Sequence, residues 1–324
     1  MINYYVSPID HSPLINKNGF LEDSSGNIFE VTNGIPNFVY PKELSKSDLD
    51  SLEWYKNNAA SYDEFLPLTF ETFGVDEDQE REKLIKNLNL SLDHKVLEIG
   101  CGTGRDSEKI LNCLGAEGEL YLQDISPEIL KIAVDKFSNK KFDANVFFSL
   151  SNAYYLPFPD HYFDRVFHFG GLNTFGDLPK TFSEIIRVTK PGGRVVVGDE
   201  NMPIWLRETE FGKVLMNSNP HYRYHLPLEH LPIEARNVSL EWFIGGVFYM
   251  ISFDVGTGEP YANLDFEIPG IRGGTHRTRF YGHLEGVKPE TLQIAKKARE
   301  KSGKSMHQWL NDAIQAAALQ DLEN

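Results

Sequence analysis

Apolar and polar residues change their spacing along the chain, and this change divides it into segments. Between Lys95 and Glu200, short apolar runs alternate with stretches in which apolar residues recur every three or four positions. This alternation predicts a mainly parallel sheet whose strands are joined by right-handed helical crossovers. Strands are expected at residues 95–100, 118–124, 145–150, 162–170 and 194–200, and helices at 107–114, 127–136 and 181–188.

The flanking segments have a different character. Strand-like pieces with turn signals such as Asn33-Gly34 come first, and helical spacing follows at 49–73 and 77–88. The C-terminal region has strand-like runs and Gly-rich turns, then two helical stretches that break at Ser302-Gly303. We therefore expect an N-terminal β appendage with a helical cap (1–90), a Rossmann-like core (91–200), remaining core strands with a substrate-covering region (201–285) and a helical tail (286–324).

The composition narrows the class of protein. At 324 residues, with 41% hydrophobic and 24% charged residues, the chain is expected to fold as a large α/β unit with appended parts. A net charge of -15 disfavours a nucleic-acid partner and favours a small-molecule substrate. The cysteines, Cys101 and Cys113, form no CxxC pair, which favours a reduced cytoplasmic setting, and no segment resembles an export signal or a membrane span.

The strongest chemical signal is the segment VLEIGCGTG, residues 96–104, in which an apolar strand runs into glycines at alternate positions. Glycine is needed where a backbone turns tightly and approaches a ligand closely. A dinucleotide-binding loop of the G-x-G-x-x-G type would require glycine at position 105, which is Arg105 here. The spacing therefore favours a loop that holds an amino-acid tail rather than a pyrophosphate.

Residues 95–200 resemble class I S-adenosylmethionine-dependent methyltransferases, and most closely those related to ubiquinone and menaquinone biosynthesis (methyltransferase domain type 11). The resemblance rests on VLEIGCGTG, on LPF followed by FD, and on EIIRVTKPGGRVVV. It implies a seven-stranded Rossmann-like sheet with helices on both faces and S-adenosylmethionine as the cofactor. It also implies that Glu98 helps to hold the cofactor's amino group, and that Gly100, Cys101, Gly102 and Gly104 line its methionine part.

Two polar positions downstream match the nucleoside-binding residues of the same family. Asp124, followed by Ile125, ends a strand where a carboxylate can accept both ribose hydroxyls. The alternative is a helix N-cap, for which Ser126 is the better candidate. The family has Asp at the position of Asn152, followed by Ala as at Ala153. The amide oxygen of asparagine can still accept a hydrogen bond from the adenine amino group. A polar loop position is the alternative there.

Several residues are candidates for the reaction itself. Because methyl transfer is an in-line displacement, positioning and exclusion of water matter most, and a base is needed only for an acceptor that carries a proton. His168 is the candidate base and a contact of cofactor or substrate, with a packed core histidine as the alternative. Asp199 and Glu200 could bind a substrate amine or cap a loop. Tyr62 is expected to close over the cofactor, with simple helix packing as the alternative.

Histidines also gather in the C-terminal half of the chain, but no metal site is predicted. The intervening proline and the absence of cysteines favour a structural or substrate-contacting role. The histidines are His221, His225, His230, His276 and His283.

Two fainter resemblances concern the ends of the chain. Residues 19–41 resemble a zinc-ribbon-derived module without its metal-binding cysteines. Residues 286–319 resemble the two helices of ribbon-helix-helix proteins, which would allow a homodimer. The alternative, and the commoner arrangement, is an amphipathic helix that packs on the chain's own core.

The sequence thus predicts a methyltransferase that acts on a small molecule through an O, N or C nucleophile. One alternative is an RNA or protein methyltransferase, which a basic groove near Arg272, Arg277 and Arg279 would favour. The other alternative is a cofactor-binding regulator that uses its helical tail.

Overall fold

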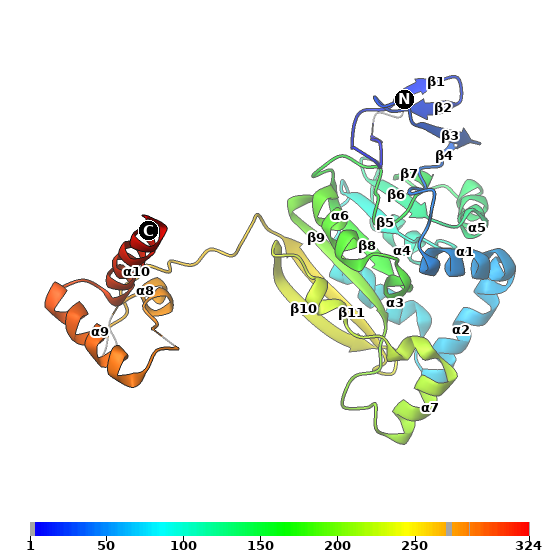
Figure 1. Ribbon diagram of the computed structural model, residues 1–324. Coiled ribbons are helices and arrows are strands. Elements are labelled where there is room, and N and C mark those ends of the chain that lie inside the picture. The colour runs from blue at the N-terminus through cyan, green and yellow to red at the C-terminus, as the bar shows by residue number, and fades with distance from the viewer. Residues whose placement is uncertain (1–3, 270–273, 285, 324) are drawn as a thin grey trace. The chain divides into compact units, whose positions relative to one another are not determined.

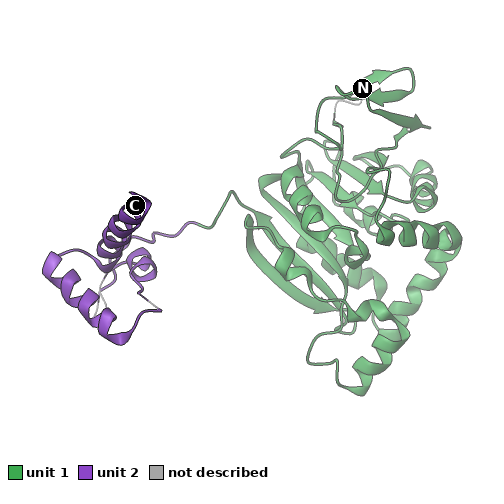
Figure 2. Cartoon of the chain, in the orientation of Figure 1, with its two compact units in different colours: residues 1–260 green, residues 261–324 purple. Residues whose placement is uncertain are grey.

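The computed structural model describes residues 4–269, 274–284 and 286–323. The chain forms two compact units, residues 1–260 and residues 261–324 (Figures 1 and 2). The boundary predicted for the helical tail, residue 286, lies inside the second unit. Arg272 of the predicted basic groove lies outside the described residues.

A seven-stranded sheet forms the centre of the first unit, in the order β10-β11-β9-β8-β5-β6-β7. The five strands from β9 to β7 are parallel, and β11 runs antiparallel between β9 and β10. This arrangement confirms the predicted Rossmann-like sheet. The strands are β5 (Lys95–Ile99), β6 (Glu119–Asp124), β7 (Asn145–Leu150), β8 (Phe163–Phe169), β9 (Thr189–Glu200), β10 (Ala235–Phe243) and β11 (Phe248–Val255).

Helices cover both faces of this sheet because successive strand residues point to opposite faces, and apolar side chains occur on each face. On one face, Leu97 and Val166 pack with Phe182 of α6. On the other face, Val96 and Leu120 pack with residues of α3, α4 and α5. The helices concerned are α3 (Glu77–Asn87), α4 (Arg105–Leu111), α5 (Pro127–Ser138) and α6 (Leu178–Val188).

The N-terminal segment forms a second sheet and a helical cap. Its four short strands, β1 (Ile15–Lys17), β2 (Phe20–Glu22), β3 (Ile28–Thr32) and β4 (Ile35–Pro36), pair antiparallel, as the β appendage predicted. The helical stretch expected at 49–73 is divided into α1 (Lys46–Asn58), a 3-10 turn η1 (Ala59–Ser61) and α2 (Tyr62–Phe73). Since α1 contacts both α5, which follows β6, and the 3-10 turn η2 (Leu172–Thr174), which follows β8, it crosses the carboxyl ends of the strands.

The connection from β9 to β10 contains α7 (Glu210–Ser218) and the 3-10 turns η3 (Pro220–Arg223) and η4 (Pro227–His230). The sequence pattern did not separate α7 from its β-rich surroundings. The hairpin turn between β10 and β11 lies at residues 244–247, where Gly245 and Gly246 both have positive φ.

The second unit is helical and consists of α8 (His276–Tyr281), α9 (Pro289–Ser302) and α10 (Met306–Glu323). Helix α9 ends at Gly303, whose φ of 70° is left-handed, so the helix breaks where the sequence predicted. Helix α10 contacts both α8 and α9. None of the helices in the described part of the chain has the length and apolar character that a membrane crossing requires.

Candidate functional site

The glycine segment forms a tight loop between β5 and α4. Gly100, Gly102 and Gly104 have φ values of 61°, 55° and 76°, a region that other residues rarely adopt. A side chain on Gly104 would also lie 2.4 Å from the ring of Phe137 on α5. A side chain on Gly102 would meet nothing within 4 Å, so there is open space beside the middle of the loop.

Asp124 lies at the end of β6, next to this loop. Its Oδ2 accepts the backbone N–H of Gly102 at 3.0 Å, and its Oδ1 accepts that of Ser126 at 2.9 Å. Ser126 is the N-cap of α5, so the alternative of an Asp124 cap is wrong. Burial raises the pKa of Asp124 to about 6, against the lowering effect of these hydrogen bonds. A carboxylate oxygen can accept a further donor, so hydrogen-bonding capacity remains. Ile125, the next residue, is half-buried.

Glu98, on β5, is buried next to the glycine loop. Its side chain is 3% exposed, and its Oε2 has no hydrogen-bond partner among the described residues. Burial raises the pKa of Glu98 well above its usual value, and the charge of Asp106 adds to the rise. Arg81 bonds Asp106 at 2.7 Å rather than Glu98. A buried acceptor without a donor indicates a place for a polar ligand or water.

Asn152 lies after β7, and the cap helix α1 fixes its orientation. Its Nδ2 contacts Oδ2 of Asp48 at 3.5 Å, and its Oδ1 accepts the N–H of Tyr154 at 3.4 Å. Asp48 also accepts the hydroxyl of Tyr154. Both Asn152 and Ala153 are buried. With its nitrogen directed to Asp48, the amide presents its oxygen as the acceptor, and an amide oxygen can accept a second donor besides the N–H of Tyr154.

His168 lies on β8 against the glycine loop. Its Nδ1 is 2.7 Å from the carbonyl oxygen of Ile99, so Nδ1 carries the proton and Nε2 has a free lone pair. Nε2 has no partner among the described residues, and the side chain is 1% exposed. Burial lowers the pKa of His168 to about 4, so the ring is neutral near pH 7. This combination is typical of a hydrogen-bond acceptor rather than of a base.

An aromatic cluster of Trp54, Tyr55 and Tyr62 belongs to the cap. The ring centroids of Tyr55 and Tyr62 are 6.0 Å apart, and Trp54 lies 5.1 Å from Tyr55. Burial raises the pKa of Tyr62 to about 12, and the nearby charge of Asp124 contributes to the rise. Burial and the charges of Asp124, Asp199 and Glu200 raise that of Tyr55. Because α1 crosses the carboxyl ends of the strands, Trp54 and Tyr55 lie on that side of the sheet, where the carboxylates are.

The cap is held down by contacts that sequence reasoning missed. Asp63 accepts the hydroxyl of Thr103 at 2.7 Å and Nε of Arg105 at 3.0 Å. Arg105 also pairs with Glu77 of α3. These residues are up to 42 positions apart in the sequence, so the contacts could not be predicted from local patterns. The single sequence signal was Arg105, which stands where a dinucleotide-binding loop would have glycine.

A second polar group lies at the carboxyl end of β9. Asp199 is buried and accepts the N–H of Asn173 at 2.6 Å and that of Glu200 at 2.8 Å. Burial and the charge of Glu200 raise the pKa of Asp199 to about 6. Glu200 accepts Nδ2 of Asn219 at 3.0 Å and lies 3.3 Å from Nδ1 of His221. Asp199 therefore caps the η2 loop, one of its predicted roles, while Glu200 has a histidine at its side.

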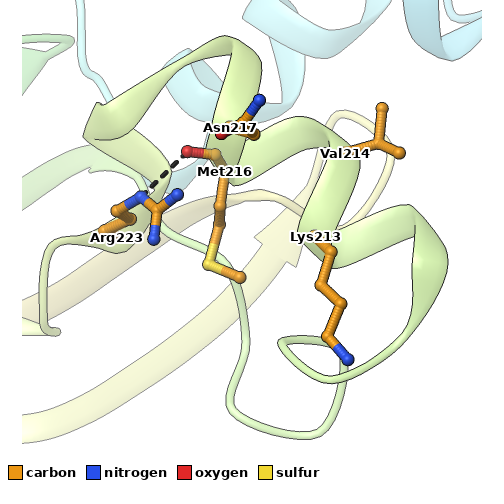
Figure 3. Close-up of a pocket in the computed structure, with 5 residues that line it drawn as sticks. All are labelled: Lys213, Val214, Met216, Asn217 and Arg223. Carbon is orange, nitrogen blue, oxygen red and sulfur yellow. Dashed lines mark hydrogen bonds between the residues drawn. The ribbon is translucent and has the colours of Figure 1, made fainter.

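Three further features concern metal ligands, a buried cysteine and a surface hollow. In the part of the chain that the structure describes, no group of three or more His, Cys, Asp or Glu could hold a metal ion. Cys101 of the loop is a buried free thiol whose pKa burial raises well above its usual value. A surface hollow of about 440 Å³ on α7, where Arg223 donates to the carbonyl of Met216 at 2.9 Å (Figure 3), is lined by Lys213, Val214, Met216, Asn217 and Arg223.

Known proteins resemble part of this chain. Residues 90–243 match the model of a methyltransferase domain family. The ubiquinone/menaquinone biosynthesis C-methyltransferase of Francisella philomiragia is 34% identical over 146 residues, which are 45% of this chain and 57% of that protein. The same enzyme of Marinomonas sp. is 35% identical over 145 residues, 40% of this chain and 56% of the relative. The chain thus spans little more than half the length of these relatives.

Among solved structures, a SAM-dependent methyltransferase from Aquifex aeolicus is 20% identical with a TM-score of 0.39. The similarity covers 54% of this chain and 89% of that one.

Proposed function

We propose that this chain, whose residues 90–243 match a methyltransferase domain family, transfers a methyl group from S-adenosylmethionine to a small molecule. The observation that carries the proposal is the set of buried acceptors around the glycine loop. Glu98 Oε2 and His168 Nε2 are buried without a donor, and Asp124 keeps acceptor capacity beside the open space at Gly102.

These residues fit the cofactor's chemistry. Its ammonium group supplies N–H donors for Glu98, its ribose supplies two hydroxyls for Asp124, and its adenine amino group suits the amide oxygen of Asn152. His168 Nε2 has one lone pair, which accepts a donor either of the cofactor or of the substrate beside it. When bound, the cofactor supplies an electrophilic methyl group on a positively charged sulfur. We assign the remaining contacts to residues that line the same edge: Tyr62, Gly100, Cys101, Gly102, Gly104, Ile125 and Ala153.

The residues of the chain contribute positioning. The loop glycines and Asp124 set the place of the nucleoside, and the cap with Tyr62 excludes water from the strand ends. A buried acid at these strand ends favours cations over anions, since a positive charge offsets the carboxylates there. We further propose that the methyl acceptor is a small molecule and that the protein acts in the cytoplasm.

Calorimetric titration with S-adenosylhomocysteine, the demethylated cofactor, tests the cofactor assignment directly. We expect one site per chain with a heat signal that is lost in the Asp124→Ala variant. Transfer of radiolabelled methyl groups to a filtrate of small metabolites, compared with transfer to RNA and to protein fractions, separates the small-molecule acceptor from the alternatives. The proposal fails if the protein takes up neither form of the cofactor.

A further inference from the structure

We propose that the acceptor subsite lies at the carboxyl end of β9 and takes the protonated amine of a small molecule, which Asp199 and Glu200 hold. The inference rests on the proposed methyl transfer and adds the chemical class of the acceptor. Four features of the structure carry it.

The first feature is the buried carboxylate of Asp199, which has no cationic partner among the described residues. Asp199 is 4% exposed and is held by backbone N–H groups, and no lysine or arginine of the described residues pairs with it. Glu200 follows directly in the chain. An ammonium ion can offset these charges, whereas a carboxylate or phosphate acceptor would be repelled.

The second feature is that the two arginines beside the glycine loop, Arg81 and Arg105, are paired with carboxylates of the protein. Arg81 is bonded to Asp106 at 2.7 Å and to Glu77 at 2.7 Å. Arg105 is bonded to Asp63 and Glu77. Both guanidinium groups are therefore engaged with carboxylates of the protein itself.

The third feature is His168, on the same face of the sheet as Asp199. His168 pairs in register with Val197, and Asp199 lies two residues further along β9. Because Nδ1 donates to the carbonyl of Ile99, Nε2 can only accept, and it is buried without a partner. An acceptor in this position requires an N–H or O–H donor, and a protonated amine brings three.

The fourth feature is the aromatic cover. Tyr55 belongs to α1, which contacts α5 after β6 and η2 after β8, and the charges of Asp124, Asp199 and Glu200 add to the rise of its pKa. Tyr62 lies 6.0 Å from it, centroid to centroid. Aromatic faces attract cations, so carboxylates below and aromatic rings above form surroundings suited to an ammonium group.

The pairing of Glu200 with His221 offers a way out for the proton. The acceptor's R–NH3⁺ transfers one proton to the Glu200–His221 pair and becomes R–NH2, and the half-exposed His221 passes that proton to solvent. The amine nitrogen then forms a bond to the methyl carbon with its lone pair. The carbon–sulfur bond breaks at the same time, its electron pair stays on sulfur, and the positive charge moves from sulfur to nitrogen.

Binding of matched probes tests the acceptor class. The full chain is first saturated with S-adenosylhomocysteine, and this step tests the cofactor assignment separately. It is then titrated with benzyl, phenethyl and butyl probes, each as the amine, the alcohol and the carboxylate. We expect the amines to bind at least about tenfold more tightly than the matched alcohols and carboxylates. Equal or weaker binding of the amines, or no binding in any series, overturns the inference while the cofactor assignment stands.

A matched pair of variants locates the subsite. Glu200→Gln should weaken amine binding about tenfold and leave the affinity for S-adenosylhomocysteine unchanged, which also reports that the fold is intact. Glu229→Gln is the control, because Glu229 also lies beside a histidine, 3.7 Å from His230, but is exposed on η4. It should bind every probe like the wild type. Amine binding that survives Glu200→Gln unaltered contradicts the assignment.

Discussion

Replacing Asp124 by asparagine removes one charge from the site with little change in shape. In the structure Asp124 Oδ2 accepts Gly102 N–H and Oδ1 accepts Ser126 N–H, and an asparagine keeps only one of these oxygens. A hydrogen bond to a charged group contributes about 1.5–3 kcal/mol, and one to a neutral group about 1 kcal/mol. The difference predicts a loss of about 1–2 kcal/mol in cofactor binding, or roughly five- to thirtyfold in Kd.

The pH dependence gives this prediction a sign. The pKa of Asp124 is raised to about 6, and ribose hydroxyls donate to the ionised form, so cofactor binding and protonation compete. Affinity for S-adenosylhomocysteine should therefore fall as the pH is lowered through about 6, and Asp124→Asn should remove part of that fall. Asp199 titrates in the same range in both proteins, so only the difference between their curves belongs to Asp124.

Calorimetry from pH 5 to pH 8, with melting temperatures recorded in parallel, is the assay. The control is Asp164→Asn, because Asp164 also accepts a backbone N–H, that of Lys95 at 2.9 Å, but lies at the amino end of β8. An Asp124→Asn protein with unchanged Kd and an unchanged pH profile would refute the ribose assignment. Equal weakening by Asp164→Asn would show that the effect is general destabilisation.

Two further substitutions test the packing beneath the site. Gly104→Ala should lower the free energy of unfolding in urea by about 2–4 kcal/mol, because it combines left-handed backbone strain with a clash against Phe137. Gly192→Ala is the control, because Gly192 has a φ of 80° but open space around it, and it should cost only the strain of about 1–2 kcal/mol. Arg81→Met should lower the free energy of unfolding by about 3–5 kcal/mol, because it leaves the buried Asp106 carboxylate unpaired. Adding Asp106→Asn should restore part of this stability, and a double variant whose losses simply add would contradict the pairing.

The strand and helix alternation of residues 95–200 was predictable because it is a local property of apolar spacing. The helix signals were local too: Ser126 caps α5, and Gly303 ends α9. The break of the expected helix 49–73 at η1 was not predictable in this way. Nor was the insertion of β11 between β9 and β10, because strand order is set by pairing between distant segments.

Some residues of the candidate site have a local sequence signal, and others do not. The glycine loop and Asp124 stand out because their residue types follow strands at characteristic positions. Asp48, which orients Asn152 from 104 positions away, carries no such local signal. Asn173 is similar, since its contact with Asp199 exists only because β8 and β9 end side by side.

By itself, the sequence determined the kind of sheet, the place of the glycine loop and the identity of the acids at the strand ends, because these depend on backbone preferences of neighbouring residues. Only the tertiary structure decided which groups are buried and without partners. That His168 is a neutral acceptor follows from the carbonyl of Ile99 beside it and from its burial. The charge of a group depends on its surroundings, and the surroundings come from chain segments that are distant in sequence.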